Sequence, residues 1–497
     1  MTGICCQILR WGGDPVLARH GHHTTFQHQL QTDVAQWPPH WGDPRAWQDA
    51  LTWSLAADLD GLRPILAAAY HPTRGRPPID PVTLLRAMGL QIIFGESSIS
   101  RWVQRLQQTP FLARLCGWSG KVPAVGTFYN FLYRLYPDPD RRRGALRRPS
   151  GRKLKLRPGE KIPPKRPGVT GRVARRVLRE AARPARPRVT DRWDALLAAV
   201  VQASVRRGVL PPTWDLAVDG SPIESGAHSF GRKVCDCPGK RCGCLRYFGD
   251  AHALLGWDSY RNRYYFGYNV VSLAVTNAVP GRPAHPLVVS LGLHPANRSD
   301  GVAYPALLVK TQRRFAGTGA TIRRVIGDSA FDVDDLWTFT QARDVTPVFA
   351  PHSPPKPPQV SPAAAAAGIR LNGQHQPVCA AERPLVPRGW ARRGVRHWAC
   401  PLVNKTAPAC PTPCAKAHKL VSINFRGTRY DQLGLPYRSP EWDAVYAQRT
   451  SVERAHSLWE TGGVKAARHR RRYVWYGRLV IGAIAQHVQA WVREAAS

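Results

Sequence analysis

Apolar residues recur at helical spacing in the first part of the chain. From Leu85 to Met88 to Ile92 they follow at steps of three and four, which is typical of the buried face of a helix. Asp80 is a suitable N-cap and Pro81 a suitable first helical residue. The same pattern predicts two further helices, at 99–107 and from Thr127 onward. We therefore expect a compact helical domain that ends near residue 136.

The pattern changes after residue 190, where β-rich runs alternate with helical ones. Helices are predicted at 191–210, 301–315 and 334–343, and strands at 216–219, 263–276 (as one bent strand or two), 285–293, 321–328 and 345–351. Strands and helices in this order indicate a mixed sheet with flanking helices. A strong helical pattern returns at 440–460, with Ser439 as its cap and Pro440 as its first residue, and a last helix closes the chain.

Two segments interrupt these patterns. Residues 137–188 hold 19 Lys and Arg against 4 Asp and Glu, with many prolines, so they cannot bury enough apolar surface to order themselves. We interpret them as a basic linker with one short helix at 172–182, and favour an arm that tracks DNA over a solvated spacer. Residues 351–435 are rich in Pro and Ala and carry four cysteines. A structureless insertion of that length is uncommon, so we expect a separate unit.

These patterns divide the chain into five segments. They are a helical domain at 1–136, a linker at 137–190, the first part of an α/β core at 191–350, an insertion at 351–435 and the final part of the core at 436–497.

The charge of the chain points to its partner. The formal net charge is +38, from 71 Lys and Arg against 33 Asp and Glu. Such an excess favours a polyanion, most simply nucleic acid. No run of 18 apolar residues suggests a membrane span, and the first residues do not resemble a signal peptide. We therefore expect a cytoplasmic protein.

Three carboxylates stand out in this basic chain. Asp219 and Asp328 each end a predicted strand and are followed by small residues, and acids at strand ends face a shared crevice in α/β sheets. Glu453 is predicted on one helix face with Tyr446 and Arg449, on or beside the apolar stripe. Converging carboxylates can hold two Mg²⁺ ions for a phosphoryl displacement. The alternatives are that both aspartates form turns and that Glu453 only pairs with Arg449.

These residues resemble the DDE transposases of bacterial insertion sequences. The segments LAVDGSPI and RRVIGDSAFD are similar to the family's two aspartate segments. The final helix resembles the pattern Y-x2-R-x3-E-x6-K through Tyr446, Arg449 and Glu453, but Glu460 stands where Lys is expected. Lys465 is a substitute at a different spacing. Residues 80–136 are similar to the amino-terminal domain of the same elements.

The resemblance implies a fold, an activity and a site. The fold is a ribonuclease H-like core with a helical, DNA-binding amino-terminal domain. The activity is Mg²⁺- or Mn²⁺-dependent nicking at the ends of the element and joining to target DNA. The metal ligands are Asp219, Asp328 and Glu453, and Tyr446 and Arg449 lie near the bound DNA end. The expected partners are the element's terminal inverted repeats, target DNA and a second copy of the chain, as a homodimer on DNA.

The cysteines suggest zinc. One set lies in a CxC-x4-CxC run and the other in the insertion; the first is Cys235, Cys237, Cys242 and Cys244, and the second is Cys379, Cys400, Cys410 and Cys414. Four thiolates can make a tetrahedral zinc site, although CxC is an unusual spacing. The alternatives are reduced surface thiols for the first set, and His397 or His418 as competing ligands in the second.

Three other functions remain open at this point. The chain could be a transposase-derived DNA-binding protein without catalysis, which the Glu460 departure favours. It could also be a ribonuclease H-like nuclease that cuts DNA without joining it. In a third interpretation, zinc organises a nucleic-acid-binding module whose acidic residues are structural.

Overall fold

The computed structural model describes most of the chain, in two compact units. The described residues are 21–71, 78–138, 144–148, 168–239, 242–352, 358–373, 375–390, 395–403, 420–424 and 435–496. The first unit combines Met1–Ile326 with Arg449–Ser497, and the second is Gly327–Gln448. In the described part of the chain, no helix combines the length and hydrophobicity needed to cross a membrane.

The first unit begins with helices, as the sequence predicts. They are α1 (His23–Ala35), α2 (Gln48–Ala56), α3 (Arg63–Ala67), α4 (Pro81–Ile93), α5 (Ile99–Gln108), α6 (Pro110–Cys116) and α7 (Val125–Arg134), with short 3-10 turns η2 (Pro39–Trp41), η3 (Pro44–Trp47) and η4 (Asp60–Leu62). At the start of α4, the side chain of Asp80 accepts a hydrogen bond from the backbone N–H of Val82, so the predicted cap is confirmed. The long carboxy-terminal helix α16 (Arg472–Ala496) packs on α2, α4 and α7.

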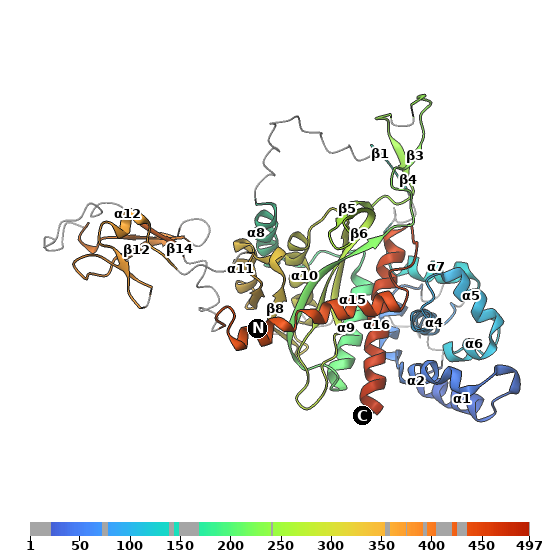
Figure 1. The fold of residues 1–497 in the computed structure, drawn as a ribbon. Coiled ribbons are helices and arrows are strands. Elements are labelled where there is room, and N and C mark those ends of the chain that lie inside the picture. Colours follow the sequence, from blue (N-terminus) through green and yellow to red (C-terminus); the bar gives the residue numbers. More distant parts are fainter. Residues whose placement is uncertain are drawn as a thin grey trace. The chain divides into compact units, whose positions relative to one another are not determined.

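A mixed sheet forms the centre of this unit (Figure 1). Its strands here are β2 (Thr213–Glu224), β5 (Leu254–Asp258), β6 (Arg263–Val275), β7 (Val288–Pro295) and β8 (Thr321–Gly327). β2 lies between β6, to which it is antiparallel, and β8, to which it is parallel. The other edge of β6 pairs with β5 and then with β7. The predicted mixed sheet is therefore confirmed, with the run at 263–276 as one strand.

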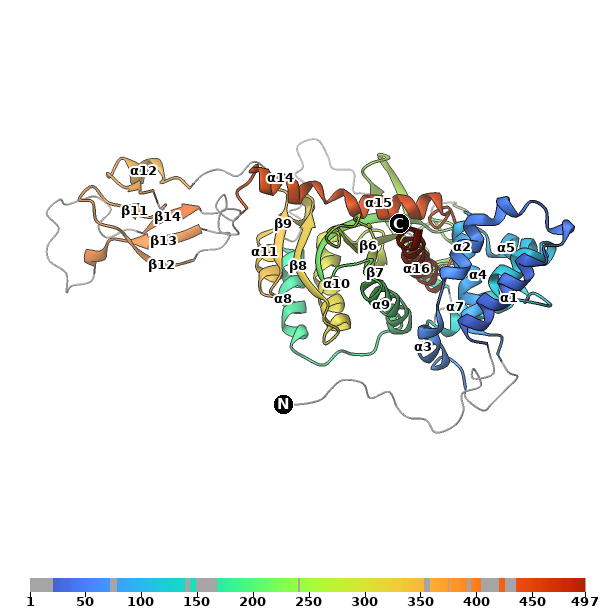
Figure 2. The same cartoon turned by 90° about the horizontal axis from the view of Figure 1, so that it is seen from below.

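Helices cover both faces of this sheet (Figure 2). On one face lie α9 (Asp191–Arg206), which packs on β7, and α10 (Asp300–Phe315), which packs on β6 and β7. On the other face lies α15 (Thr450–Thr461), which packs on β2 and β6. Helix α16 packs on α9 as well as on the amino-terminal helices, so one helix joins the helical domain to the core.

Parts of the predicted linker are ordered. Helix α8 (Val169–Ala181) packs on α10, and β1 (Ala145–Arg147) pairs with β4 (Arg246–Phe248), which in turn pairs with β3 (Arg232–Lys233). The short helix predicted at 172–182 is thus confirmed, whereas β1 was not predicted. Helix α8 is amphipathic: Ala174 and Val177 are buried while its arginines stay outside.

The second unit holds the segment predicted as an insertion. It contains η5 (Ser329–Phe331), α11 (Asp334–Gln341), β9 (Thr346–Phe349), α12 (Pro362–Ala365), β10 (Arg370–Leu371), β11 (Pro377–Val378), β12 (Val386–Trp390), β13 (Val395–Ala399), η6 (Pro401–Val403), β14 (Val421–Asn424) and α14 (Pro440–Ala447). Strands β12, β13 and β14 form an antiparallel sheet. Within it, Trp398, Val421 and Ile423 are buried in a small core of their own. The boundaries 351 and 435 stay a prediction.

The predicted helix at 440–460 is two helices. α14 ends at Ala447 and α15 begins at Thr450. Ser439 caps α14, accepting from the backbone N–H of Trp442, and Pro440 is its first residue, as predicted. The expectation of one helix face shared by Tyr446 and Glu453 is therefore wrong.

Candidate active site

Asp219 lies inside a strand and not at its end. β2 continues to Glu224, so the predicted turn after Asp219 is wrong. The parallel ladder with β8 is shorter, and its last pair is Ala217 with Ile326. Asp219 therefore lies two residues beyond the point where β8 stops pairing, and it is half-buried. One of its carboxylate oxygens accepts a hydrogen bond from the backbone N–H of Gly220 at 2.8 Å.

The residue after Asp219 must be small. Gly220 faces the other side of the sheet, and a Cβ built there would lie 2.1 Å from a carboxylate oxygen of Asp300, at the start of α10. Asn269 of β6 donates to that same oxygen at 2.6 Å. The glycine thus lets α10 approach one face, and Asp219 is left on the other.

Helix α15 covers the face that carries Asp219. The Cα partner of Asp219 in β6 is Ser272, and directly opposed residues point to the same face. His456 of α15 reaches Ser272, with 2.6 Å between Nε2 and Oγ. Burial, and secondarily the charge of Lys465, lower the pKa of His456 to about 3. A neutral imidazole therefore anchors α15 beside Asp219.

Glu453 lies three residues before His456, in the first turn of α15. Its side chain is 47% exposed, so of the two predicted positions, on or beside the apolar stripe, it occupies the one beside it. The apolar stripe of α15 turns Val452 and Trp459 inward and leaves Glu453 outside. Arg449, the residue before α15, forms an ion pair with Glu453 at 2.7 Å. The carboxylate of Glu453 is accessible, and it forms the ion pair with Arg449 that the sequence allows as an alternative to metal binding.

Asp328 lies in the second unit, directly after β8. Its side chain caps η5 by accepting a hydrogen bond from the backbone N–H of Ala330 at 2.9 Å. This contact fits the turn-forming role that the sequence also allows. One carboxylate oxygen is enough for it, so the contact and metal binding are compatible.

Lys465 and Glu460 form a pair beside the Asp219 strand. The ammonium group of Lys465 lies 2.8 Å from a carboxylate oxygen of Glu460 and 2.6 Å from Oγ of Ser221. Ser221 follows Asp219 by two residues, so both side chains point to the same face. Lys465 is 13% exposed and Glu460 is 54% exposed. The lysine that follows α15 therefore reaches the region of the site, and the unexpected Glu460 is its partner.

Buried Arg478 of α16 fixes the loop that carries Lys465. Its guanidinium donates to the carbonyls of Gly463 at 2.9 Å and Val464 at 3.2 Å. Burial lowers the pKa of Arg478 to about 10, which leaves it charged at neutral pH. Sequence reasoning missed these holding contacts, as it missed Ser221, Ser272 and His456. They arise from packing between distant segments and leave no local signal.

Tyr446 belongs to α14 in the second unit. Its ring stacks on Trp442, with centroids 4.6 Å apart and planes 13° apart. Both rings lie on one side of α14 because the residues are four apart. The structure thus gives Tyr446 an aromatic partner, and its expected contact with DNA stays a prediction.

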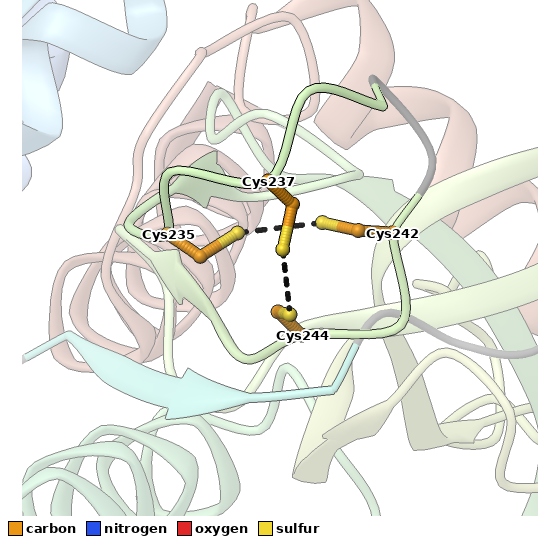
Figure 3. A group of neighbouring side chains, drawn as sticks. All are labelled: Cys235, Cys237, Cys242 and Cys244. Carbon is orange, nitrogen blue, oxygen red and sulfur yellow. Dashed lines mark hydrogen bonds between the residues drawn. The ribbon is translucent and has the colours of Figure 1, made fainter.

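The first cysteine set gathers into one cluster (Figure 3). The four sulfur atoms lie within 4.8 Å of one another. Two pairs are hydrogen-bonded, Cys235 with Cys242 at 3.4 Å and Cys237 with Cys244 at 3.5 Å. The hydrogen bond from the Cys235 thiol is the main cause that lowers the pKa of Cys242 to about 7. The hydrogen bond with Cys237 raises the pKa of Cys244 to about 12.

The second cysteine set is only partly described. Cys379 and Cys400 are half-buried, and Cys379 packs against the small core of the second unit. Cys410, Cys414 and the competing ligand His418 lie outside the described residues. The other competitor, His397, hydrogen-bonds Oγ of Ser422 through Nδ1 at 2.9 Å.

Two family comparisons identify the protein. Residues 51–134 match a transposase domain (DUF772), and residues 211–485, more than half of the chain, match the transposase DDE domain. The chain belongs to the DDE transposase family. The second match spans both aspartates, Glu453 and the cysteine cluster, and implies a ribonuclease H-like fold for the mixed sheet. None of the curated proteins compared with the chain matches it.

Membership settles the activity at family level. The transposase is an enzyme of an insertion sequence that cleaves DNA and transfers strands. Its substrate is DNA, and DDE transposases use divalent metal ions, typically Mg²⁺. The resemblance drawn from the sequence is therefore confirmed.

Proposed function

We propose that Asp219, Asp328 and Glu453 are the catalytic carboxylates of this transposase and hold two Mg²⁺ ions, or Mn²⁺. The observation that carries the proposal is the register of β2 and β8. Ala217 and Ile326 are partners in the parallel ladder, and each aspartate follows its strand's partner by two residues. Asp219 in β2 and Asp328 directly after β8 are thus at the same sequence distance from the last pair of the ladder.

The surroundings of Glu453 support its assignment. α15 is anchored by His456 to Ser272, the partner of Asp219, and Glu453 lies one turn away on the exposed side of that helix. Three carboxylates are the hard oxygen donors that Mg²⁺ prefers. Two such cations would stabilise the attacking and leaving oxygens of an in-line displacement.

We propose that two basic side chains beside these carboxylates, Arg449 and Lys465, bind DNA phosphates. Arg449 pairs with Glu453 and so lies within reach of any phosphate that approaches it. Lys465 holds its ammonium beside Ser221, with Glu460 as its positioning partner. In this interpretation Lys465 supplies the charge that the family pattern places at residue 460. Tyr446 is proposed to contact the DNA end as well.

We further propose which molecules the enzyme binds. They are the terminal inverted repeats of the element, the target DNA and a second copy of the chain, forming a homodimer on DNA. The excess of 71 Lys and Arg over 33 Asp and Glu supports binding of two DNA segments. Because that DNA is the bacterial chromosome, we place the enzyme in the cytoplasm, at the nucleoid.

We also propose that Cys235, Cys237, Cys242 and Cys244 bind one Zn²⁺. Zn–S bonds of about 2.3 Å in a tetrahedron separate neighbouring sulfurs by about 3.8 Å. The observed separations, from 3.4 Å to at most 4.8 Å, bracket that value. The CxC spacing suits an extended segment, because residues two apart point to the same side. Half-buried Cys235 and Cys237 alternate with exposed neighbours in this way.

Two cations next to the cluster support the zinc assignment. The ammonium of Lys233 donates to the carbonyl of Cys237, and the Arg246 side chain hydrogen-bonds the Cys242 thiol. Four thiolates around Zn²⁺ leave a net charge of −2, which these two cations would offset. For Cys379, Cys400, Cys410 and Cys414, zinc stays a prediction.

The test of the active site replaces each carboxylate in turn. Asp219→Ala, Asp328→Ala and Glu453→Ala should each abolish nicking of a duplex that carries the element end, while binding of that duplex largely remains. Glu382→Ala is the control acid, because Glu382 is exposed and pairs with Arg370, outside the proposed site. Retained nicking in any of the three variants would remove that residue from the metal site.

A further inference from the structure

The small sheet of β1, β4 and β3 carries exposed side chains that the proposed active site does not use. Figure 1 shows these strands extending beyond β5 and β6. The side chains of Arg232, Val234 and Leu245 are exposed, with Val234 at 50% and Leu245 at 47%. We call residues 228–248, which include β3, the cysteine cluster and β4, the cysteine ribbon.

The two faces of the cysteine ribbon differ. Lys233 and Arg246 are Cα partners and share the side of the thiols, where each has a contact with the cluster. Arg232 and Tyr247 are the neighbouring partners and therefore point the other way. The guanidinium of Arg232 lies over the ring of Tyr247, 5.5 Å from its centroid. The cations beside the thiols serve the metal, and Arg232 is available to a partner.

The base of the cysteine ribbon is fixed to the catalytic sheet. Asp250, two residues after the ribbon, is 1% exposed and accepts hydrogen bonds from Oγ of Ser225 at 2.8 Å and from the hydroxyl of Tyr268 at 2.5 Å. Ser225 follows β2, the strand of Asp219, and Tyr268 lies in β6. A partner bound to the ribbon is therefore held at a set position relative to Asp219.

We propose that the cysteine ribbon is a DNA-binding element that enters a groove of the DNA substrate. The sequence of the ribbon holds five Lys and Arg and one Asp. The major groove of B-DNA admits a two-stranded β-ribbon. Arg232 contacts phosphate, and the exposed Val234 and Leu245 lie against the groove. The inference rests on the proposed zinc site, which ties the two strands together.

Charge decides between DNA and a second copy of the chain as the occupant. The exposed apolar side chains alone would also suit a protein partner. Two copies of a ribbon with five cations and one acid would repel each other at close range. DNA phosphates attract the same surface, with release of counterions.

The experiment compares arginine variants of the full-length enzyme. Arg232→Ala removes a ribbon charge, and Arg493→Ala removes an exposed charge near the end of α16 as the matched control. Binding of a labelled element-end duplex is measured from low to high salt, together with bound zinc and molecular mass in solution. We expect the magnitude of the slope of log affinity against log salt concentration to decrease by about one unit for Arg232→Ala, which is the value for one lost phosphate contact. The slope for Arg493→Ala should match the parent.

Each other outcome overturns the proposal. A parental slope in Arg232→Ala, or equal losses in both variants, removes the ribbon from the DNA interface. A change of mass with unchanged DNA affinity assigns the ribbon to contact between copies. The amount of bound zinc shows whether Arg232→Ala keeps the ribbon folded. If that variant loses zinc, Arg232→Lys replaces it and should keep both the zinc and the parental salt slope. A smaller salt slope in Arg232→Lys with zinc bound contradicts the proposal. Nicking by Arg232→Ala at saturating enzyme tests the active site separately.

Discussion

His456 makes the attachment of α15 to the catalytic sheet dependent on pH. The imidazole is buried, lies 2.6 Å from Oγ of Ser272, and has its pKa lowered to about 3 by burial and by Lys465. In the opened state the same group has an ordinary pKa of about 6.5. Between these values only the opened state takes up a proton, so attachment is strongest above pH 6.5 and weakens as the pH falls toward 3.

The magnitude follows from the opened-state pKa. At about pH 5, the pH lies about 1.5 units below the pKa of the opened state, so the opened state is protonated while the closed state stays neutral. This difference weakens the attachment of α15 by about 2 kcal/mol. In His456→Gln that term is absent, because glutamine does not titrate. Other buried histidines, such as His294 and His469, also have pKa values lowered to about 3 by burial. A global unfolding curve would therefore mix their effects with that of His456.

Hydrogen exchange of the amides of α15 isolates the local effect. The opening free energy is measured at about pH 7 and about pH 5, after correction for the intrinsic exchange rate. We expect a fall of about 2 kcal/mol in the parent and a clearly smaller fall in His456→Gln. His40→Gln, at an exposed position, should behave as the parent. Equal falls in parent and His456→Gln, or no fall in the parent, would refute the reasoning.

Two further predictions concern the site and the cysteine ribbon. Lys465→Ala should weaken binding of the element-end duplex and lower its salt slope by about one unit, whereas Lys465→Arg should restore most of both; unchanged binding in Lys465→Ala would exclude the phosphate contact. The purified enzyme should release about one equivalent of zinc from the ribbon when its thiols are blocked. The double variant Cys235→Ser with Cys242→Ser should release about one equivalent less than the parent. Equal release from both proteins would contradict the zinc site in the ribbon.

Local sequence patterns predicted the architecture well where few residues decide it. Asp80 and Ser439 cap their helices as expected, because capping depends on residues within one turn. The mixed sheet followed from the order of the elements. The break between α14 and α15 could not be predicted, since Tyr446, Ala447 and Arg449 are all compatible with a helix. The strand β1 was missed because its pairing with β4 depends on a distant segment.

The sequence predicted which residues form the candidate site but not how their side chains are arranged in space. Asp219, Asp328 and Glu453 are visible in the sequence because acids are rare in this chain. The sequence left open whether Glu453 lies on or beside the apolar stripe, and the structure places it beside the stripe. The pair of Lys465 and Glu460 was not derivable, since the loop between them is held by Arg478, from another helix.

The most direct test of the account is strand transfer by the purified enzyme. A labelled element-end duplex, a supercoiled target and Mg²⁺ are incubated with the parent, with Glu453→Gln and with the control Glu382→Gln, at an exposed acid outside the site. We predict joined product from the parent and from Glu382→Gln, and none from Glu453→Gln, although all three bind the duplex. Joined product from Glu453→Gln at the parental rate would contradict the proposed catalytic carboxylates.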